Sequence, residues 1–339
     1  MNKQHVLYHE DIANTLNIDG IGTLKGKSVL VTGATGLIGL HLIDALMSLG
    51  DVSVYAVGRS KYKANNRLGE YFGNPMFHFI EQDVCEPFSH DLKVDFIFPG
   101  ASNTHPLAYS QFPIETIQIN VKGIENALNL AVRCNAVLLY PSTVEVYGNA
   151  KGNENFIEEY TGILNLATSR SCYTESKRLA EAMCQSYIAE KGVNVKIVRL
   201  SRIFGPTMLD SDTKASSQFI LNAIQNKDIV LKSSGEQFFS YTYVSDAVAA
   251  MLYVLIHGKC GEAYNISNDK CNVHLKDFAR LCAEYNNKEV VFDLPSDAER
   301  KGFSIATQAI LDNSKLQNLG FSPKYEIRDA IYRTIEILK

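Results

Sequence analysis

Tyr173 and Lys177 are the two residues whose types and spacing point most directly to catalysis. They lie four residues apart in a stretch with a helical pattern, so both side chains project from one helix face, one turn apart. An ammonium beside a phenol stabilises the phenolate and lowers the pKa of the tyrosine toward neutral pH. The spacing therefore predicts that Tyr173 is a general base, with a plain pair on a helix surface as the alternative.

Hydroxyl and carboxylate side chains follow a buried strand that we expect over Val137–Ser142. Thr143 comes directly after this strand, and its hydroxyl can hydrogen-bond the substrate oxygen that Tyr173 deprotonates. Glu145 lies just past the strand tip, where it can serve as a second acid–base group. The competing interpretations are a strand-end cap for Thr143 and a solvated loop carboxylate for Glu145.

A glycine-rich turn lies near the start of the chain, between the apolar run 28–32 and the helical stretch Leu40–Leu49. Gly33 lets the chain turn sharply, Gly36 lets the backbone approach phosphates, and Gly39 lets the helix pack close to the sheet. The helix N-terminus then faces the anion. We expect the turn to bind the pyrophosphate of a dinucleotide through the following residues: Gly33, Thr35, Gly36, Leu37, Ile38 and Gly39. The alternative is a tight strand–helix turn without a ligand.

The elements that position these residues alternate between strand and helix. Alternation of this kind predicts a Rossmann-type α/β fold, a doubly wound parallel sheet with helices on both faces. The predicted strands are 28–32, Val52–Val57, Phe77–Gln82, Asp95–Pro99, Val137–Ser142 and Val195–Ser201. The predicted helices between them include Leu40–Leu49, Ile114–Arg133 and Tyr173–Lys191.

Beyond Gly205-Pro206 the predicted elements become smaller, which indicates a second, C-terminal α/β domain that binds the substrate. We expect an N-terminal extension over 1–25, a dinucleotide-binding domain over 26–205 and a mainly substrate-binding domain over 206–339. Tyr241–His257 is expected to return to the first domain. The further predicted elements are Glu10–Leu16, Ser216–Asn226, Ile229–Leu231, Tyr264–Ile266, Leu275–Glu284 and Ile327–Leu338.

Composition excludes several classes of function. The 339 residues are 46% apolar and 21% charged with a net charge of −4, which is typical of a soluble globular protein. No basic tract predicts nucleic-acid binding, and no apolar run is long enough to span a membrane. The seven cysteines and eight histidines lack metal-ligand spacing, so we predict no metal site and a cytoplasmic protein with reduced thiols.

Taken together, these motifs resemble the extended short-chain dehydrogenase/reductase family, the NAD-dependent epimerases and dehydratases that modify nucleotide sugars. The resemblance runs from about residue 26 to the C-terminus. It is carried by Gly33-x-x-Gly36-x-x-Gly39, Asp83-Val84, Asn120, Ser142-Thr143, Tyr173-x-x-x-Lys177 and Gly205-Pro206.

The resemblance implies roles for these residues. Tyr173 would take a hydroxyl proton while hydride passes to the nicotinamide, giving a keto-sugar. Lys177 would hold the nicotinamide ribose and Thr143 would polarise the oxygen. Asp83 would lie near the adenine and Asn120 would support the catalytic helix. Further contacts are implied for the cofactor at Val84, Ala101 and Ser142, and for the substrate at Ser102 and Gln218.

Among subfamilies the chain looks most similar to UDP-glucuronate decarboxylases. The segments that carry this likeness are 142–148, with Glu145, and 172–181, supported by 204–208 and 217–221. Sugar 4,6-dehydratases have an Asp-Glu pair where this chain has Val144 and Glu145, and simple 4-epimerases usually need no Glu there. The resemblance thus favours a decarboxylase-like or epimerase-like reaction over a dehydratase.

Three departures affect the substrate. Arg202 stands where the family often has an Asn near the phosphates, and Phe239 stands where it often has an Arg that grips the diphosphate. Ala309 stands where the decarboxylases have an Arg near the substrate. Arg202 and Arg300 are our candidates for supplying the positive charge, because an arginine fork binds phosphate or carboxylate well. The alternative for Arg202 is a structural ion pair.

The cofactor is expected to be NAD(P), with NADP slightly favoured. NAD-binding proteins usually have an acidic residue after the second strand to hold the ribose 2′-hydroxyl. Gly58 stands at about that place, and the following Arg59, Ser60 and Lys61 can grip a 2′-phosphate. A basic surface loop is the alternative interpretation.

Three functions therefore compete. The first is a redox-neutral nucleotide-sugar enzyme, the second an NADPH-dependent reductase of a keto-sugar or activated polyol. The third is a dinucleotide-binding scaffold, which the intact Thr143, Tyr173 and Lys177 disfavour. Apolar residues on more than one face of Ile114–Arg133 and Tyr173–Lys191 also predict a homodimer, because the resembling family pairs such helices across a two-fold axis.

Overall fold

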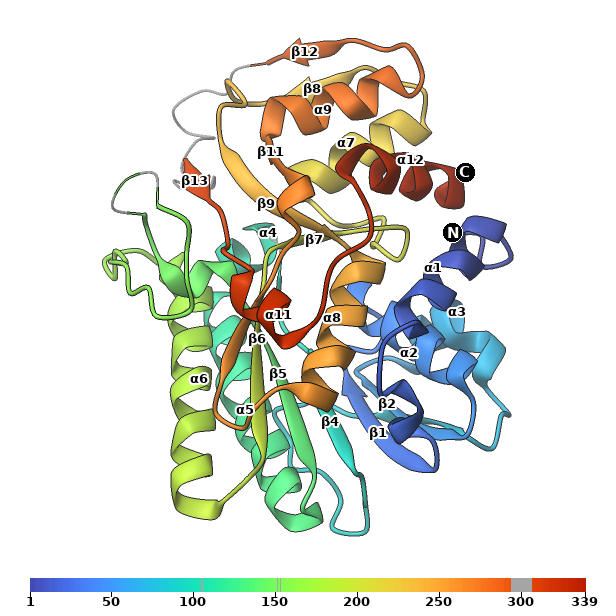
Figure 1. Ribbon diagram of the computed structural model, residues 1–339, viewed down its shortest axis with the longest axis vertical. Coiled ribbons are helices and arrows are strands. Elements are labelled where there is room, and N and C mark those ends of the chain that lie inside the picture. Colours follow the sequence, from blue (N-terminus) through green and yellow to red (C-terminus); the bar gives the residue numbers. More distant parts are fainter. Residues whose placement is uncertain (105, 151, 153, 294–306) are drawn as a thin grey trace.

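The strands expected in the first two thirds of the chain assemble into one parallel sheet. The computed structural model describes residues 1–104, 106–150, 152, 154–293 and 307–339. Seven strands follow the order β10-β6-β5-β4-β1-β2-β3, and each neighbouring pair is parallel (Figure 1). They are β1 Lys27–Thr32, β2 Val52–Gly58, β3 Phe77–Glu81, β4 Phe96–Pro99, β5 Val137–Thr143, β6 Val195–Leu200 and β10 Ala263–Ile266.

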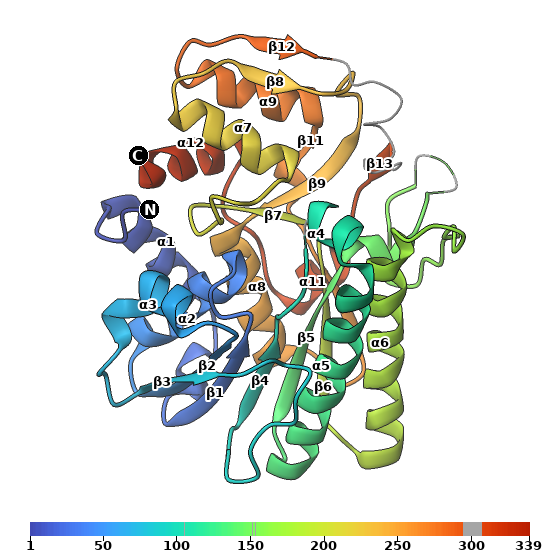
Figure 2. The same cartoon turned by 180° about the vertical axis from the view of Figure 1, so that it is seen from behind.

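Helices cover both faces of this sheet, so the predicted doubly wound Rossmann-type fold is confirmed. Helices α5 (Pro113–Cys134) and α6 (Ser171–Lys191) lie side by side on one face, and α2 (Leu37–Leu49) and α8 (Val244–His257) lie on the other (Figures 1 and 2). Helix α1 (Val6–Leu16) packs against α2 and α8, and α3 (Lys61–Leu68) follows β2.

The apolar run of β1 forms a strand because both of its faces are buried. Val29 and Val31 belong to the hydrophobic cluster shared with α2 and α8, whereas Leu30 belongs to the cluster beneath α5 and α6. Strands buried on both faces read as continuous apolar runs, as β1 does. The register pairs Thr32 with Val57 and Pro99, so the carboxyl ends of these strands meet at one edge.

A smaller lobe lies over that edge (Figure 1). Its larger sheet joins β7 (Arg202–Phe204), β9 (Phe238–Tyr243), β11 (Asn272–His274) and β13 (Gln308–Ala309), and β8 (Ile229–Leu231) pairs with β12 (Val290–Phe292). Among the described residues after β6, the α-helices besides α8 are α7 Ala215–Ile224, α9 Leu275–Glu284, α11 Ser314–Leu319 and α12 Ile327–Leu338.

Segments from the C-terminal third also return to the large sheet. Strand β10 extends the sheet beside β6, and α8 packs against β5, β6 and β10. We expected the whole segment Tyr241–His257 to return to the first domain. Its helix α8 packs on the large sheet, whereas Tyr241–Tyr243 belongs to β9 in the smaller lobe. No helix in the described parts of the chain is long and apolar enough to cross a membrane.

Candidate active site

The turn between β1 and α2 has a backbone that tolerates only glycine at two positions. Gly33 adopts a φ of +68°, and a Cβ there would lie 2.7 Å from the carbonyl oxygen of Gly100. A Cβ on Gly39 would lie 2.3 Å from the carbonyl oxygen of Gly33. Gly36 caps α2 without a side-chain hydrogen bond, so the first backbone N–H groups of the helix remain available to an anion. These features fit the pyrophosphate of a dinucleotide.

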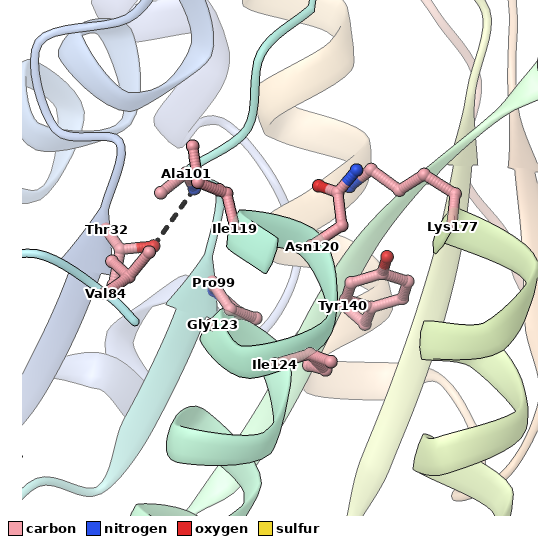
Figure 3. A pocket seen from close by; sticks show the side chains of 10 residues that line it. All are labelled: Thr32, Val84, Pro99, Ala101, Ile119, Asn120, Gly123, Ile124, Tyr140 and Lys177. Atoms are coloured by element: carbon pink, nitrogen blue, oxygen red, sulfur yellow. Dashed lines mark hydrogen bonds between the residues drawn. The ribbon is translucent and has the colours of Figure 1, made fainter. Parts of the chain in front are cut away.

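Beside this turn, the predicted cofactor residues Val84, Ala101, Asn120 and Lys177 line one cavity of about 10 Å³ (Figure 3). The Ala101 N–H donates to Thr32 Oγ1 at 3.0 Å. Figure 3 shows Lys177 reaching from α6 toward Asn120 on α5. The structure thus brings together side chains that lie nearly one hundred residues apart in sequence.

Asn120 ties the catalytic helix to the sheet edge. Its Nδ2 donates to Ser176 Oγ at 2.8 Å, and its Oδ1 accepts from Ser102 Oγ at 2.7 Å. Lys177, one residue beyond Ser176, donates from Nζ to the Pro141 carbonyl at 2.9 Å and lies over the Tyr140 ring at 4.9 Å. These contacts fix α6 relative to α5 and β5.

Burial sets the pKa values of both catalytic candidates. Burial lowers the pKa of Lys177 to about 8, and the charge of Glu181 opposes this shift. Burial also raises the pKa of the Tyr173 phenol well above its ordinary value, and the charge of Glu145 raises it further. A hydrogen bond with Thr143 and the charge of Arg170 act in the other direction. The expected lowering of the Tyr173 pKa is therefore wrong, because desolvation outweighs the Thr143 hydrogen bond and the charge of Arg170.

Glu145 is held firmly rather than solvated in a loop. Arg170 grips it with two hydrogen bonds, Nη1 to Oε2 and Nη2 to Oε1, each 3.1 Å long. Thr174 Oγ1 donates to Oε2 at 3.4 Å, and the Glu145 N–H donates to Thr143 Oγ1 at 3.3 Å. The Thr143 hydroxyl thus links the Glu145 backbone to the Tyr173 phenol, and the charge of Glu145 raises the pKa of that phenol.

Two residues of this site were missed by sequence reasoning. Arg170 precedes Tyr173 by three residues, and that helical spacing is a signal that could have found it. Tyr109, on α4 (Pro106–Gln111), stacks on the Tyr173 ring with centroids 5.2 Å apart. No spacing rule links Tyr109 to Tyr173, since they meet through tertiary packing, in a hydrophobic cluster with Cys172.

Arg202 lies on β7 with its guanidinium over the Phe239 ring, 3.4 Å from the ring centroid. Its Nη1 atom is buried and has no hydrogen-bond partner among the described residues. The charges of Glu145, Tyr109 and Arg170 all affect its pKa, which burial lowers. Arg202 thus belongs to the same group of side chains as Glu145, and the structural ion pair considered as its alternative is not found among the described residues.

Other predicted residues have different contacts. Ser142 lies with Tyr140 on the strand face toward α6, and its hydroxyl donates to Glu181 at 2.5 Å. Gln218 is exposed on α7, where its amide donates to the Asp212 carbonyl at 2.5 Å. The hydrogen bonds of Ser142 and Gln218 therefore involve none of Thr143, Tyr173 and Glu145.

The residues expected at the adenosine end lie at the edge of the sheet. Arg59, which follows β2, pairs with Glu115 of α5 at 2.7 Å, and Asp83 accepts from the Cys85 N–H at 2.9 Å. Arg300 lies outside the described residues. Within those residues, no group of three or more His, Cys, Asp or Glu side chains is placed to hold a metal ion.

Chemically, the site joins a buried phenol, a hydroxyl, an ammonium and a carboxylate beside an anion-binding turn. This set can move a proton from a substrate hydroxyl and then a second proton at a neighbouring atom. A dinucleotide held at the turn would supply the hydride acceptor.

Comparison with known proteins agrees with this assembly. A family model described as the NAD dependent epimerase/dehydratase family matches residues 29–267. UDP-glucuronic acid decarboxylase 1 of Xenopus tropicalis is 33% identical over 321 residues, which cover 92% of this chain and 72% of that protein. UDP-glucuronic acid decarboxylase 6 of Arabidopsis thaliana is 31% identical over 89% of this chain and 86% of its own length.

Solved structures confirm the fold. UDP-glucuronic acid 4-epimerase from Bacillus cereus, in complex with UDP-glucuronic acid and NAD, superimposes with a TM-score of 0.79 at 21% identity, covering 92% of this chain and 98% of that one. dTDP-glucose 4,6-dehydratase from Bacillus anthracis, in complex with NAD, gives a TM-score of 0.77 at 20% identity, covering 92% and 96%.

Proposed function

The chain belongs to the NAD-dependent epimerase/dehydratase family, and we propose that it oxidises a sugar hydroxyl of a nucleotide sugar to a keto intermediate in a redox-neutral reaction. The observation that carries this proposal is the meeting of Thr143, Tyr173 and Glu145 beside Lys177. A plain reductase needs Thr143, Tyr173 and Lys177 but has no use for a carboxylate that Arg170 clamps beside them.

Each side chain has a distinct part. Tyr173 accepts the proton of the sugar hydroxyl, and Thr143 hydrogen-bonds the same oxygen as it becomes a carbonyl. Lys177 places a positive charge beside the phenol once both contact the ligand, which offsets the desolvation that raises the phenol pKa. The bound dinucleotide supplies the hydride acceptor.

Glu145 is assigned to the second proton transfer. A keto group next to the carbon that bears a carboxylate or a proton makes loss of carbon dioxide or of that proton easier. The relatives named decarboxylases support a decarboxylase-like reaction, and an epimerase-like one uses the same intermediate. Val144 is buried and apolar where a dehydratase has an acid, which disfavours elimination of water.

For the cofactor we propose NAD(P) with a slight preference for NADP. Arg59 lies beyond the end of β2, and Ser60 caps α3 by accepting from the Lys63 N–H at 3.3 Å. We expect these residues to bind the 2′-phosphate, and Arg59 also pairs with Glu115 of α5 at 2.7 Å. The same basic residues support the second candidate, an NADPH-dependent reductase of a keto-sugar or activated polyol.

We also propose a cytoplasmic homodimer. All seven cysteines are free, which suits a reducing compartment. Exposed apolar side chains lie on α5 and α6, including Ile114, Ile117 and Leu179, and a second copy could cover them. Light scattering should give twice the mass of the chain, and a monomer would contradict this part of the proposal.

Tyr173→Phe and Glu145→Gln variants test the proposed roles. Tyr173→Phe should lower turnover by about 10²- to 10⁴-fold, because it removes the general base. Glu145→Gln should still form the keto intermediate but should not complete the reaction. Tyr187→Phe is the matched control on the same helix, since its hydroxyl contacts Asn129 on the exposed side.

The readout is the product mass for a panel of nucleotide sugars. Loss of carbon dioxide, loss of water or an unchanged mass distinguishes decarboxylation, elimination and epimerisation. If no nucleotide sugar reacts, or if Tyr173→Phe keeps the full turnover of the wild type, the proposed function is wrong.

A further inference from the structure

Arg202 has a buried N–H group with no partner inside the candidate active site. Its Nη1 makes no hydrogen bond with any described residue. Buried polar groups in native proteins nearly always have a hydrogen-bond partner, and a guanidinium does not escape the cost by losing its proton. The missing partner is therefore expected to come from a bound molecule.

The strand pairing explains how this guanidinium is held. Arg202 on β7 pairs with Tyr241 on β9, and Phe239, two residues earlier on β9, pairs with Ala309 on β13. Because strand side chains alternate with a period of two, all four residues share one face of the smaller sheet. The Phe239 ring forms a platform 3.4 Å from the guanidinium. A stacked guanidinium is held in place with less flexibility than a free one.

Charge balance points to the kind of ligand. Among the three neighbouring side chains Glu145, Arg170 and Arg202 there are two positive charges and one negative charge. Both Glu145 oxygens are already engaged by Arg170, in a pair of 3.1 Å hydrogen bonds. One positive charge of this group therefore has no ionic partner among the described residues, and the fork geometry of an arginine suits a phosphate or a carboxylate.

We infer that Arg202 binds an oxyanion of the substrate, either the diphosphate of a nucleotide sugar or a carboxylate on its sugar, and so determines which substrates enter. This inference rests on the proposed function and adds a substrate class to it. The guanidinium of Arg202 reaches over Phe239 from the neighbouring strand and is held there for such an oxyanion.

Calorimetric binding to the dinucleotide-loaded protein tests the inference. Wild type is screened with UDP, CDP, GDP and dTDP, and the nucleotide that binds best is then used alone and as its glucose and glucuronate sugars. Arg202→Gln should weaken binding of the anionic probe by about tenfold to a hundredfold, as expected for loss of a charge-assisted hydrogen bond. Arg202→Lys should recover part of the loss, because it restores the charge without the fork.

The probes separate the two sources of the oxyanion. Equal weakening for the bare nucleoside diphosphate and for both sugars identifies the diphosphate as the ligand of Arg202. Weakening for the glucuronate form alone identifies the carboxylate. Arg280→Gln on α9 is the control for loss of one positive charge, since its side chain is exposed and pairs with Asp277.

A further measurement distinguishes loss of a ligand contact from a general loss of structure. The NADP affinity of Arg202→Gln should stay at the wild-type value, because the glycine turn lies in the other lobe. If Arg202→Gln binds every probe as tightly as wild type does, the inference is wrong and the proposed function stands. If wild type itself binds no nucleotide or nucleotide sugar, both are wrong.

Discussion

Lys177 shows how a buried cation in the candidate active site costs stability. The folded protein holds its ammonium in a buried position with one hydrogen bond, to the Pro141 carbonyl, and its pKa falls from 10.5 to about 8. Between these two pH values the unfolded chain binds more protons than the folded one, so stability rises with pH in this window. Below pH 8 the ammonium is charged in both states, and the full desolvation penalty is present.

Lys177→Met should therefore make the ligand-free protein more stable at pH 7 while abolishing turnover. We expect a gain of about 1–2 kcal/mol, which is about 1.4 kcal/mol per pKa unit less the lost hydrogen bond. The gain should shrink as the pH rises from 8 toward 10. Urea denaturation across this range measures it, with the exposed Lys63→Met as control. A gain in stability that does not change with pH would show that folding leaves the pKa of Lys177 unchanged.

At the residue scale, sequence alone predicted a catalytic set but not the environment in which the structure places it. Tyr173, Lys177 and Thr143 were found because spacing along one helix and the end of one strand are local properties. The pKa of Tyr173 was misjudged, since burial depends on Tyr109 and α4, which no local pattern reveals. Arg202 was recognised as a departure, but its place over Phe239 follows from strand pairing across the smaller sheet.

At the element scale, the turn between β1 and α2 determines whether a dinucleotide can bind. Gly39→Ala would place a Cβ 2.3 Å from the Gly33 carbonyl oxygen, so α2 would have to move away from the sheet. We expect loss of NAD(P) binding and a destabilisation of about 1–3 kcal/mol, as for overpacking. Fluorescence titration with NADP and NAD, together with thermal unfolding, measures both effects.

Gly22→Ala is the matched control, because a Cβ there meets no atom within 4 Å. It should leave cofactor affinity and stability near the wild-type values. If Gly39→Ala binds the dinucleotide as well as Gly22→Ala does, the turn is a structural connection and not a phosphate site.

Long helices were predictable, whereas most of the short strands were not. Helices α9 and α12 have the bounds expected from their periodic patterns, and the short strand β8 is the exception that was also predicted. Strands β7, β11 and β13 have two or three residues each, too few for any alternation to be visible in the sequence. Each of them pairs with β9, which lies elsewhere in the chain. Such pairing is visible in the folded structure and not in the local sequence.

At the scale of the whole molecule, the two ends of the chain are joined through one buried carboxylate. Asp11 on α1 is fully buried and accepts from Arg333 Nη2 of α12 at 2.8 Å and from Tyr325 Oη at 2.8 Å. Tyr243, at the end of β9, donates to its other oxygen at 2.5 Å. The N-terminal residues thus form part of the folded core between both lobes, which the expectation of an extension over 1–25 did not anticipate.

Asp11→Asn should destabilise the protein by about 3 kcal/mol, because it leaves the buried Arg333 guanidinium without its nearest carboxylate. Urea denaturation monitored by circular dichroism measures the free energy of unfolding. Asp19→Asn is the control, since that side chain is 87% exposed. Equal stability of the two variants would show that the buried pair does not hold α1 to α12.

The global topology was predictable because strand and helix patterns alternate along the first two hundred residues, and right-handed parallel connections leave few alternatives. Strand β10 and helix α8 return to the large sheet from the C-terminal third of the chain. The sequence predicted this return for the segment that contains α8 but not for β10. The fold gathers Glu145, Arg170 and Arg202 from three separate parts of the chain, so the charge balance of the site is a property of the whole fold.

Rapid mixing of the dinucleotide-loaded protein with its nucleotide sugar tests the central claim most directly. The measurement follows the absorbance of reduced nicotinamide through a single turnover. A redox-neutral enzyme should show a rise and a return to the starting value without external NADPH, and Glu145→Gln should rise and stay high. No rise in either protein, or steady consumption of added NADPH with each turnover, would contradict the account.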